Sequence, residues 1–209
     1  MKKRILIVSL VLLLIVSAAG CGSNNNGEGS ETAGPGTMEI GPKALTSDEE
    51  DLLSMAGLDG TDGTGLIAYQ VDDSLSVLHV KIMEYRSKTG KWEDVSGDSQ
   101  FDSLNGKFLV TFRDEGRSAH IASSHKEGGS LGSEVTGLTK LSSDDGLVAS
   151  TIDKPVAIKP DKEIAVYMTA RAKADADEGA APPLEAYPSV DKFSQFDVVR
   201  AVVVWFSAD

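Results

Sequence analysis

Hydrophobic and polar positions alternate over much of residues 66–206, and this alternation predicts β-strands. Strands are expected at residues 66–71, 75–85, 91–95, 107–113, 155–158, 164–171 and 198–206, which are rich in β-branched and aromatic residues and are separated by turns. The segment 198–206 is apolar on both faces except for Arg200, so it is expected at the centre of a covered sheet. Many short strands, frequent turns and almost no helix predict an all-β fold, an antiparallel β-sandwich.

Residues 46–57 predict one short N-terminal helix, because Ser47 and Glu50 form a capping box and Gly57 provides a C-terminal stop. Residues 46–209 are therefore expected to form a single β-sandwich domain. Within it, the segment 156–171 resembles the strand-turn-strand of jelly-roll carbohydrate-binding modules. That resemblance covers under a tenth of the chain, and it implies a jelly-roll-like sandwich.

The chain before residue 46 has two different compositions. Lys2, Lys3 and Arg4 precede an apolar run that ends in small residues and the only cysteine, Cys21. This is the three-part form of a secretory signal peptide, expected over residues 1–20. The apolar run is about a dozen residues long, whereas a membrane span needs about 20. Residues 21–45 are rich in Gly, Ser, Asn and Thr and are expected to be a flexible tether.

The sequence Ala19-Gly20-Cys21 resembles the end of the bacterial lipoprotein signal. The resemblance covers only residues 1–21, and Ala18 stands where that family most often has Leu. It implies that Cys21 is lipidated with at least two acyl chains and becomes the N-terminus, which anchors the protein in the cell membrane outside the cytoplasm. A retained single-pass anchor and a secreted protein with one free thiol are the alternatives.

The composition and charge of the chain limit the classes of binding partner that are expected. The net charge is −12, and Lys2, Lys3 and Arg4 would be lost with the signal peptide, which leaves a more acidic domain. Nucleic-acid binding needs clustered Lys and Arg, which this chain lacks, so nucleic acid is excluded as a partner. Without a second Cys, no disulfide can form within the domain. The expected partners are the membrane, through the lipid, and an unknown protein or glycan.

The sequence matches a catalytic motif without the partner residues that the motif requires. Residues 128–132 fit G-x-S-x-G around Ser130, but a nucleophile elbow of this kind needs a later His. His79, His120 and His125 all precede Ser130, so a Gly-rich loop is expected instead. His120 and His125 are expected at the surface rather than on zinc. No catalytic constellation emerges, so a non-enzymatic protein is predicted.

No cofactor is expected. The acidic segments 59–63 and 175–178 could offer carboxylates to calcium, but neither has the full spacing of a calcium loop. Asp-Gly pairs are ordinary turn residues, so calcium remains only an alternative.

Trp92 and Tyr85 are the candidate ligand-binding residues. They flank a predicted hairpin, where Trp92 could stack on a sugar or could pair with Tyr85 across the strands; we favour the pair. Trp205, inside the segment 198–206, is expected in the core. The function predicted is that of a lipid-anchored extracytoplasmic module that binds a partner or supports envelope assembly. A carbohydrate-binding module using Trp92 and an unrecognised hydrolase are the alternatives.

Overall fold

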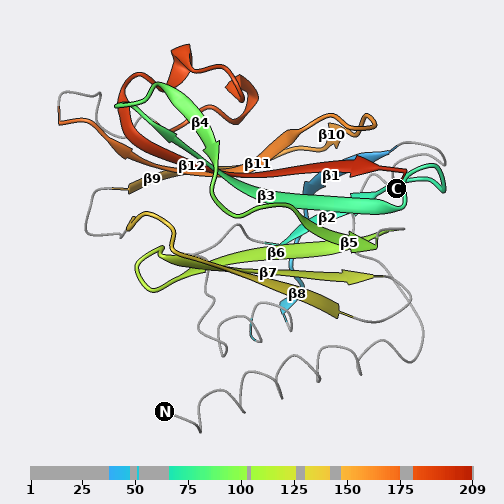
Figure 1. The fold of residues 1–209 in the computed structure, drawn as a ribbon. Coiled ribbons are helices and arrows are strands. Elements are labelled where there is room, and N and C mark those ends of the chain that lie inside the picture. Colours follow the sequence, from blue (N-terminus) through green and yellow to red (C-terminus); the bar gives the residue numbers. More distant parts are fainter. Residues whose placement is uncertain are drawn as a thin grey trace, which may run out of the picture.

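The computed structural model describes residues 38–47, 51, 66–102, 105–125, 130–141, 147–174 and 181–208. Its strands form two antiparallel sheets that lie face to face as two layers (Figure 1). The fold is therefore the antiparallel β-sandwich that the sequence predicts. No helix in the described residues is long and apolar enough to cross a membrane.

The first sheet has the strand order β10-β1-β2-β6-β7-β8. Its strands are β1 (Glu39–Pro42), β2 (Ile67–Gln70), β6 (Asn105–Arg113), β7 (Ser118–His125), β8 (Ser130–Thr136) and β10 (Val156–Ala157). The second sheet has the order β4-β3-β12-β11-β9, with β5 also paired to β3. Its strands are β3 (Val77–Arg86), β4 (Lys91–Asp94), β5 (Ser99–Asp102), β9 (Leu147–Thr151), β11 (Ile164–Ala172) and β12 (Phe196–Ser207).

The inner faces of the two sheets enclose the main core. In β3, the alternating residues Leu78, Val80 and Ile82 are fully buried, as the period-two pattern predicts. From the first sheet, Phe108 and Val110 belong to the same cluster. Each such side chain stabilises the fold by about 1.5–3 kcal/mol through the apolar surface removed from water.

Strand β12 holds the second sheet together. It pairs with β3 on one side and with β11 on the other, and its residues from Val198 to Val204 are buried. The sequence predicted a central strand covered on both faces over residues 198–206. This is confirmed for Val198–Val204, whereas Trp205 is half-buried. Arg200, the one charged residue in that apolar stretch, is also buried.

The Arg200 guanidinium ties the second sheet to the loops of the first. It lies across from Glu84 of β3, with 3.7 Å between Nη2 and Oε2. Its Nη1 donates to the Gly116 carbonyl at 2.7 Å, and Nη2 donates to the Thr139 carbonyl. Gly116 has φ +77°, and a Cβ there would lie 2.7 Å from the Leu141 carbonyl oxygen, so glycine is required. Burial lowers the pKa of Arg200, and the Glu84 charge opposes that shift.

The predicted tether boundary is wrong. The tether was predicted over residues 21–45, but Glu39–Pro42 forms strand β1, which pairs with β2 and β10. The segment has a single large apolar residue, Ile40, which is fully buried, and it also contains Gly and Pro. This composition does not predict a strand, and the strand is stabilised by its pairing with β2 and β10. The segment 1–37, with Cys21, lies outside the described residues, as does most of the helix predicted at 46–57.

The prediction of a Gly-rich loop around Ser130 is also wrong in part. Ser130 begins β8, which pairs with β7 over its length. Gly132 sits beneath His120 of β7, where a Cβ would lie 3.0 Å from the imidazole. Strands β7 and β8 are rich in Ser, Gly and His, and β5 and β9 have only four and five residues, so the β-branched signal that revealed the other strands was weak in all four.

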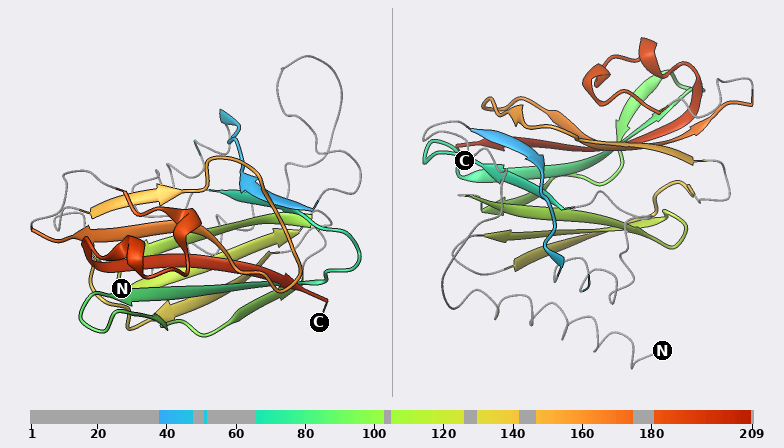
Figure 2. Two further views of the ribbon diagram at one scale, coloured as in Figure 1. Left: turned by 90° about the horizontal axis from the view of Figure 1, so that it is seen from above. Right: turned by 180° about the vertical axis from the view of Figure 1, so that it is seen from behind.

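A segment before β12 covers part of the outer face of the second sheet (Figures 1 and 2). It contains two short 3-10 helices, η2 (Leu184–Ala186) and η3 (Asp191–Phe193). Just after β11, the Lys173 amide donates to the carbonyl of Gln195, which lies just before β12, at 3.0 Å. We call residues 181–195 the covering segment.

Candidate functional site

The outer face of the second sheet divides into two halves along β3 and β12. We call one the covered half. Its sheet residues are Tyr85, Met168, Val199, Ala201 and Val203, and Trp92 and the covering segment pack on them. We call the other the open half, which comprises His79, Lys81, Asp98, Gln100, Trp205 and Ser207. Because β3 and β12 run through both, the two halves share one rigid scaffold.

Trp92 lies in the covered half, opposite Tyr85 in the β3–β4 hairpin. The two ring centroids are 5.7 Å apart. The ring of Trp92 also meets Tyr187 and Phe193 of the covering segment, at centroid distances of 5.2 and 5.1 Å. Its Nε1 atom is buried and has no hydrogen-bond partner among the described residues. Trp92 and Tyr85 thus form the cross-strand pair, and these contacts leave Trp92 poorly placed as a sugar platform.

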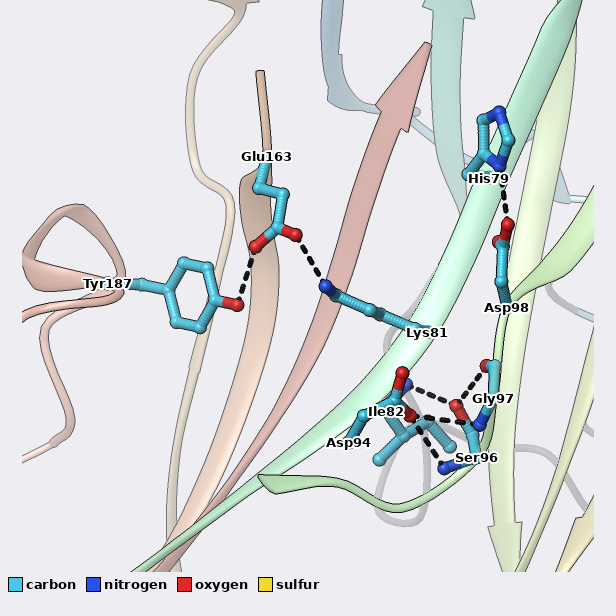
Figure 3. A network of polar contacts seen from close by, with 9 residues as sticks. All are labelled: His79, Lys81, Ile82, Asp94, Ser96, Gly97, Asp98, Glu163 and Tyr187. Carbon is cyan, nitrogen blue, oxygen red and sulfur yellow. Dashed lines mark hydrogen bonds and ion pairs between the residues drawn. The ribbon is translucent and has the colours of Figure 1, made fainter. Parts of the chain in front are cut away.

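His79 is the centre of the open half and is only 6 % exposed. Its Nδ1 lies 2.7 Å from Oδ2 of Asp98, and its Nε2 lies 2.8 Å from Oγ of Ser207. Figure 3 shows the Asp98 carboxylate pointing at the imidazole from the turn before β5. One tautomer satisfies both bonds, with Nδ1–H donating to Asp98 and Nε2 accepting from the Ser207 hydroxyl. Asp98 also accepts a hydrogen bond from the Gln100 side chain at 2.9 Å.

Trp205 is in the open half, so the expectation that it lies in the core is wrong. It is half-buried and stacks on His79, with ring centroids 4.5 Å apart and an interplanar angle of 10°. The Lys81 ammonium lies 4.9 Å from the centroid of the Trp205 ring. Alternate residues of β12 face outward, and the contacts of the covering segment end before Trp205, so an apolar sequence here leaves an aromatic ring at the surface.

The two halves are joined through Glu163, which precedes β11. This carboxylate pairs with Lys81 and accepts a hydrogen bond from the Tyr187 hydroxyl at 2.7 Å (Figure 3). Burial raises the pKa of Tyr187, and the hydrogen bond with Glu163 raises it further. The open half is therefore fixed at one side by the covering segment.

The other predicted site residues lie elsewhere. His120 is half-buried in β7 of the first sheet, and burial and the Arg113 charge lower its pKa, although Glu134 opposes them. Ser130 of the G-x-S-x-G spelling is in β8, also in the first sheet. The possible calcium segments 59–63 and 175–178 lie outside the described residues. Across the described parts, no group of three or more His, Cys, Asp or Glu residues could hold a metal.

Sequence reasoning missed the cluster of His79, Asp98 and Ser207. Asp98 is 19 positions and Ser207 is 128 positions from His79 in the sequence, so no local motif connects the three residues. The available signal was a histidine, His79, within the predicted strand 75–85. A nucleophile bonded to a base, with that base oriented by a carboxylate, is the arrangement used in serine-dependent acyl transfer.

Comparisons with known proteins identify no relative. A scan against protein-family models finds no match, and searches of curated proteins and of solved structures also find none.

Proposed function

We propose that this protein is a lipid-anchored extracytoplasmic β-sandwich that acts by binding, without catalysis, and that the open half is its binding surface. The observation that carries the proposal is the array of Lys81, Trp205 and the residues bonded to His79 on a rigid sheet. Side chains held by neighbouring bonds lose little entropy when a ligand arrives. The expected partner is a protein or glycan of the cell envelope.

The anchor is supported by the resemblance of Ala19-Gly20-Cys21 to the lipoprotein signal. Cys21→Ser should abolish metabolic labelling with a fatty acid and should release the chain from the membrane fraction or stop its maturation. Ser23→Ala is the matched control and should keep both label and location. Continued labelling of Cys21→Ser would contradict the anchor without bearing on the binding surface.

The binding surface can be tested by photo-crosslinking in cells with the full chain. Gln100 is exposed and lies opposite His79 across β3 and β5, so a photoreactive residue placed there would face a bound partner. Glu115, exposed in the turn between β6 and β7, is the matched control. A discrete adduct from position 100 and none from position 115 is expected. Equal adducts, or none at either position, would refute the open half as the binding surface.

A glycan ligand would use Trp205 rather than Trp92. On a glycan array, Trp205→Ala should then abolish binding with the fold intact, while Trp92→Ala should retain binding once its folding is checked by circular dichroism. An array on which the wild-type protein binds nothing would remove the carbohydrate alternative.

A second candidate function, ester hydrolysis, is favoured by the bonds from His79 to Ser207 and Asp98. In this reaction Ser207 Oγ attacks the ester carbonyl carbon while His79 Nε2 takes the hydroxyl proton. The proton passes to the departing alcohol, which leaves an acyl-serine. His79 then deprotonates a water that attacks the acyl group, and the acid departs while Ser207 regains its proton. Asp98 keeps the imidazole in the required tautomer.

A fluorophosphonate probe distinguishes the two candidates, because it labels only an activated serine. If the protein is a hydrolase, the wild type should be labelled, and both Ser207→Ala and His79→Ala should lose the label. Ser76→Ala is the control, since Ser76 bonds the Ala208 carbonyl and has no histidine partner in the described residues. An unlabelled wild type would exclude the hydrolase and leave binding as the function.

A further inference from the structure

Strand β8 forms one edge of the first sheet (Figure 1). It pairs with β7 from Ser118↔Thr136 to Ser124↔Ser130 without a register shift, and no described strand pairs with its other side. Such an edge presents a row of N–H and C=O groups that can pair with another chain. Proteins usually protect long edges with charged side chains, Pro or a bulge. Strand β8 has no Lys, Pro or bulge, and its one charged residue is Glu134.

An exposed apolar residue marks the same strand. Leu131 is 50 % exposed, although it lies opposite the buried Ser123 and so points to the sandwich side of the sheet. Val135, on the same face of β8, is 6 % exposed. The other edge strands in the described residues are β10, with two residues, β4 and β5, with four each, and β9, with five. At seven residues, β8 is therefore the longest of these edges.

We propose that β8 pairs with β8 of a second copy of this chain, antiparallel, about a two-fold axis through Ser133. Ser133 is the midpoint of Ser130–Thr136, so this register pairs all residues of both strands. The two copies would then share one continuous sheet. The interface is isologous, as closed dimers require.

The side chains suit this register. It places Leu131 opposite Val135 of the second copy, both on the sandwich side, so the exposed Leu131 gains an apolar neighbour. On the outer face, Glu134 lies opposite Gly132 of the second copy. The two Glu134 carboxylates are therefore diagonal neighbours and do not face each other directly, so the like-charge repulsion is smaller than in a register that places them opposite each other.

Anchoring in a membrane would favour this dimer, because its interface is small. One strand pair is small compared with stable interfaces, so the dimer is expected to be weak in dilute solution. Holding both copies on one membrane raises their effective concentration. This last point rests on the proposed lipid anchor, whereas the β8 register does not.

Disulfide trapping of the full chain in membranes of expressing cells tests the register. Directly opposed residues in an antiparallel pair have Cα atoms about 4.5–5.5 Å apart, within the range that a disulfide spans. Ser133→Cys is therefore expected to give a disulfide-linked dimer after mild oxidation. Glu134→Cys is the matched control, because its Cα atoms would be about 8 Å apart across the axis, beyond that range.

The expected result is at least a tenfold higher dimer fraction for Ser133→Cys than for Glu134→Cys, with no dimer for the wild type. A wild-type dimer would show that Cys21 has a free thiol and would count against the anchor alone. Adding Leu131→Lys to Ser133→Cys should lower the dimer fraction severalfold. Similar trapping of positions 133 and 134, or trapping of neither in folded protein, would overturn the proposal.

Discussion

The covered and open halves of the outer face of the second sheet use the same two strands and differ in what packs on them. In the covered half, Tyr85, Trp92 and Phe193 join in one aromatic cluster beneath the covering segment. In the open half, His79 and its neighbours pair through hydrogen bonds and ring stacking. The covered half is built for stability, whereas the open half holds a buried histidine beside the exposed Asp98 and Gln100.

This contrast shows how a sheet can change its role along its length. Both halves are stiffened by β12 and its partners, so the open half needs no apolar cover to remain ordered. The covering segment packs apolar residues on the covered half, and its Tyr187 donates a hydrogen bond to Glu163, which pairs with Lys81 of the open half. The following substitutions should separate the two halves by their effects on stability.

Removal of the Phe193 ring from the covering segment should have the largest effect on the free energy of unfolding. Phe193 is fully buried and contacts the rings of Tyr85 and Trp92. Phe193→Ala is expected to lower the free energy of unfolding by about 3–5 kcal/mol, since it loses apolar burial and leaves a cavity. Urea unfolding followed by circular dichroism measures this. A loss below about 1 kcal/mol would show that the cover contributes little.

The two tryptophans compare the halves directly. Trp92→Ala should lower the free energy of unfolding by about 2 kcal/mol, because the half-buried indole meets neighbouring rings in the cluster. Trp205→Ala should lower it by about 1 kcal/mol, because only the stacking on His79 and the Lys81 contact are lost. Chemical denaturation of both variants gives the comparison. The reverse order would mean that the open half is the more important for stability.

Tyr187 tests the connection between the halves. Tyr187→Phe removes the hydrogen bond to Glu163 and should cost about 1 kcal/mol at pH 7. The pKa of Tyr187 is raised in the folded protein, so its stabilising effect is full below pH 10 and is lost as the pH rises above that. Above pH 10 the wild type should therefore lose stability more steeply than Tyr187→Phe. Equal slopes in unfolding curves measured against pH would contradict the raised pKa.

A similarly small effect on stability is expected from Ser207 in the open half. Ser207→Ala removes one hydrogen bond to His79 and should cost about 1 kcal/mol, which is roughly 2–4 °C in Tm for a domain of this size. Differential scanning calorimetry resolves such a shift. A loss above about 3 kcal/mol would place Ser207 among the residues that the fold requires.

The local pattern predicted those parts of the fold that bury their own apolar residues. Val198–Val204 reads as a central strand from its composition alone, and Leu78, Val80 and Ile82 alternate as a buried face should. The strands β7 and β8 were missed because Ser, Gly and His residues adopt the extended form there through pairing with neighbours. Their stability comes from the ladder between strands, which no local window contains.

The candidate site divides in the same way. Tyr85 and Trp92 flank a short hairpin, so their pairing followed from the sequence. His79, Asp98 and Ser207 come from distant positions and meet only because β3 pairs with β5 and β12. The exposure of Trp205 depends on where a separate segment stops covering the sheet.

By itself, the sequence determined the all-β class and the central place of Val198–Val204. These properties depend on residue type and on spacing along one strand. Only the tertiary structure decided which half of the outer face is covered, where Trp205 lies and which groups surround His79. Such features depend on the register between strands and on contacts between residues far apart in the chain, and the pattern within one segment carries no information about either.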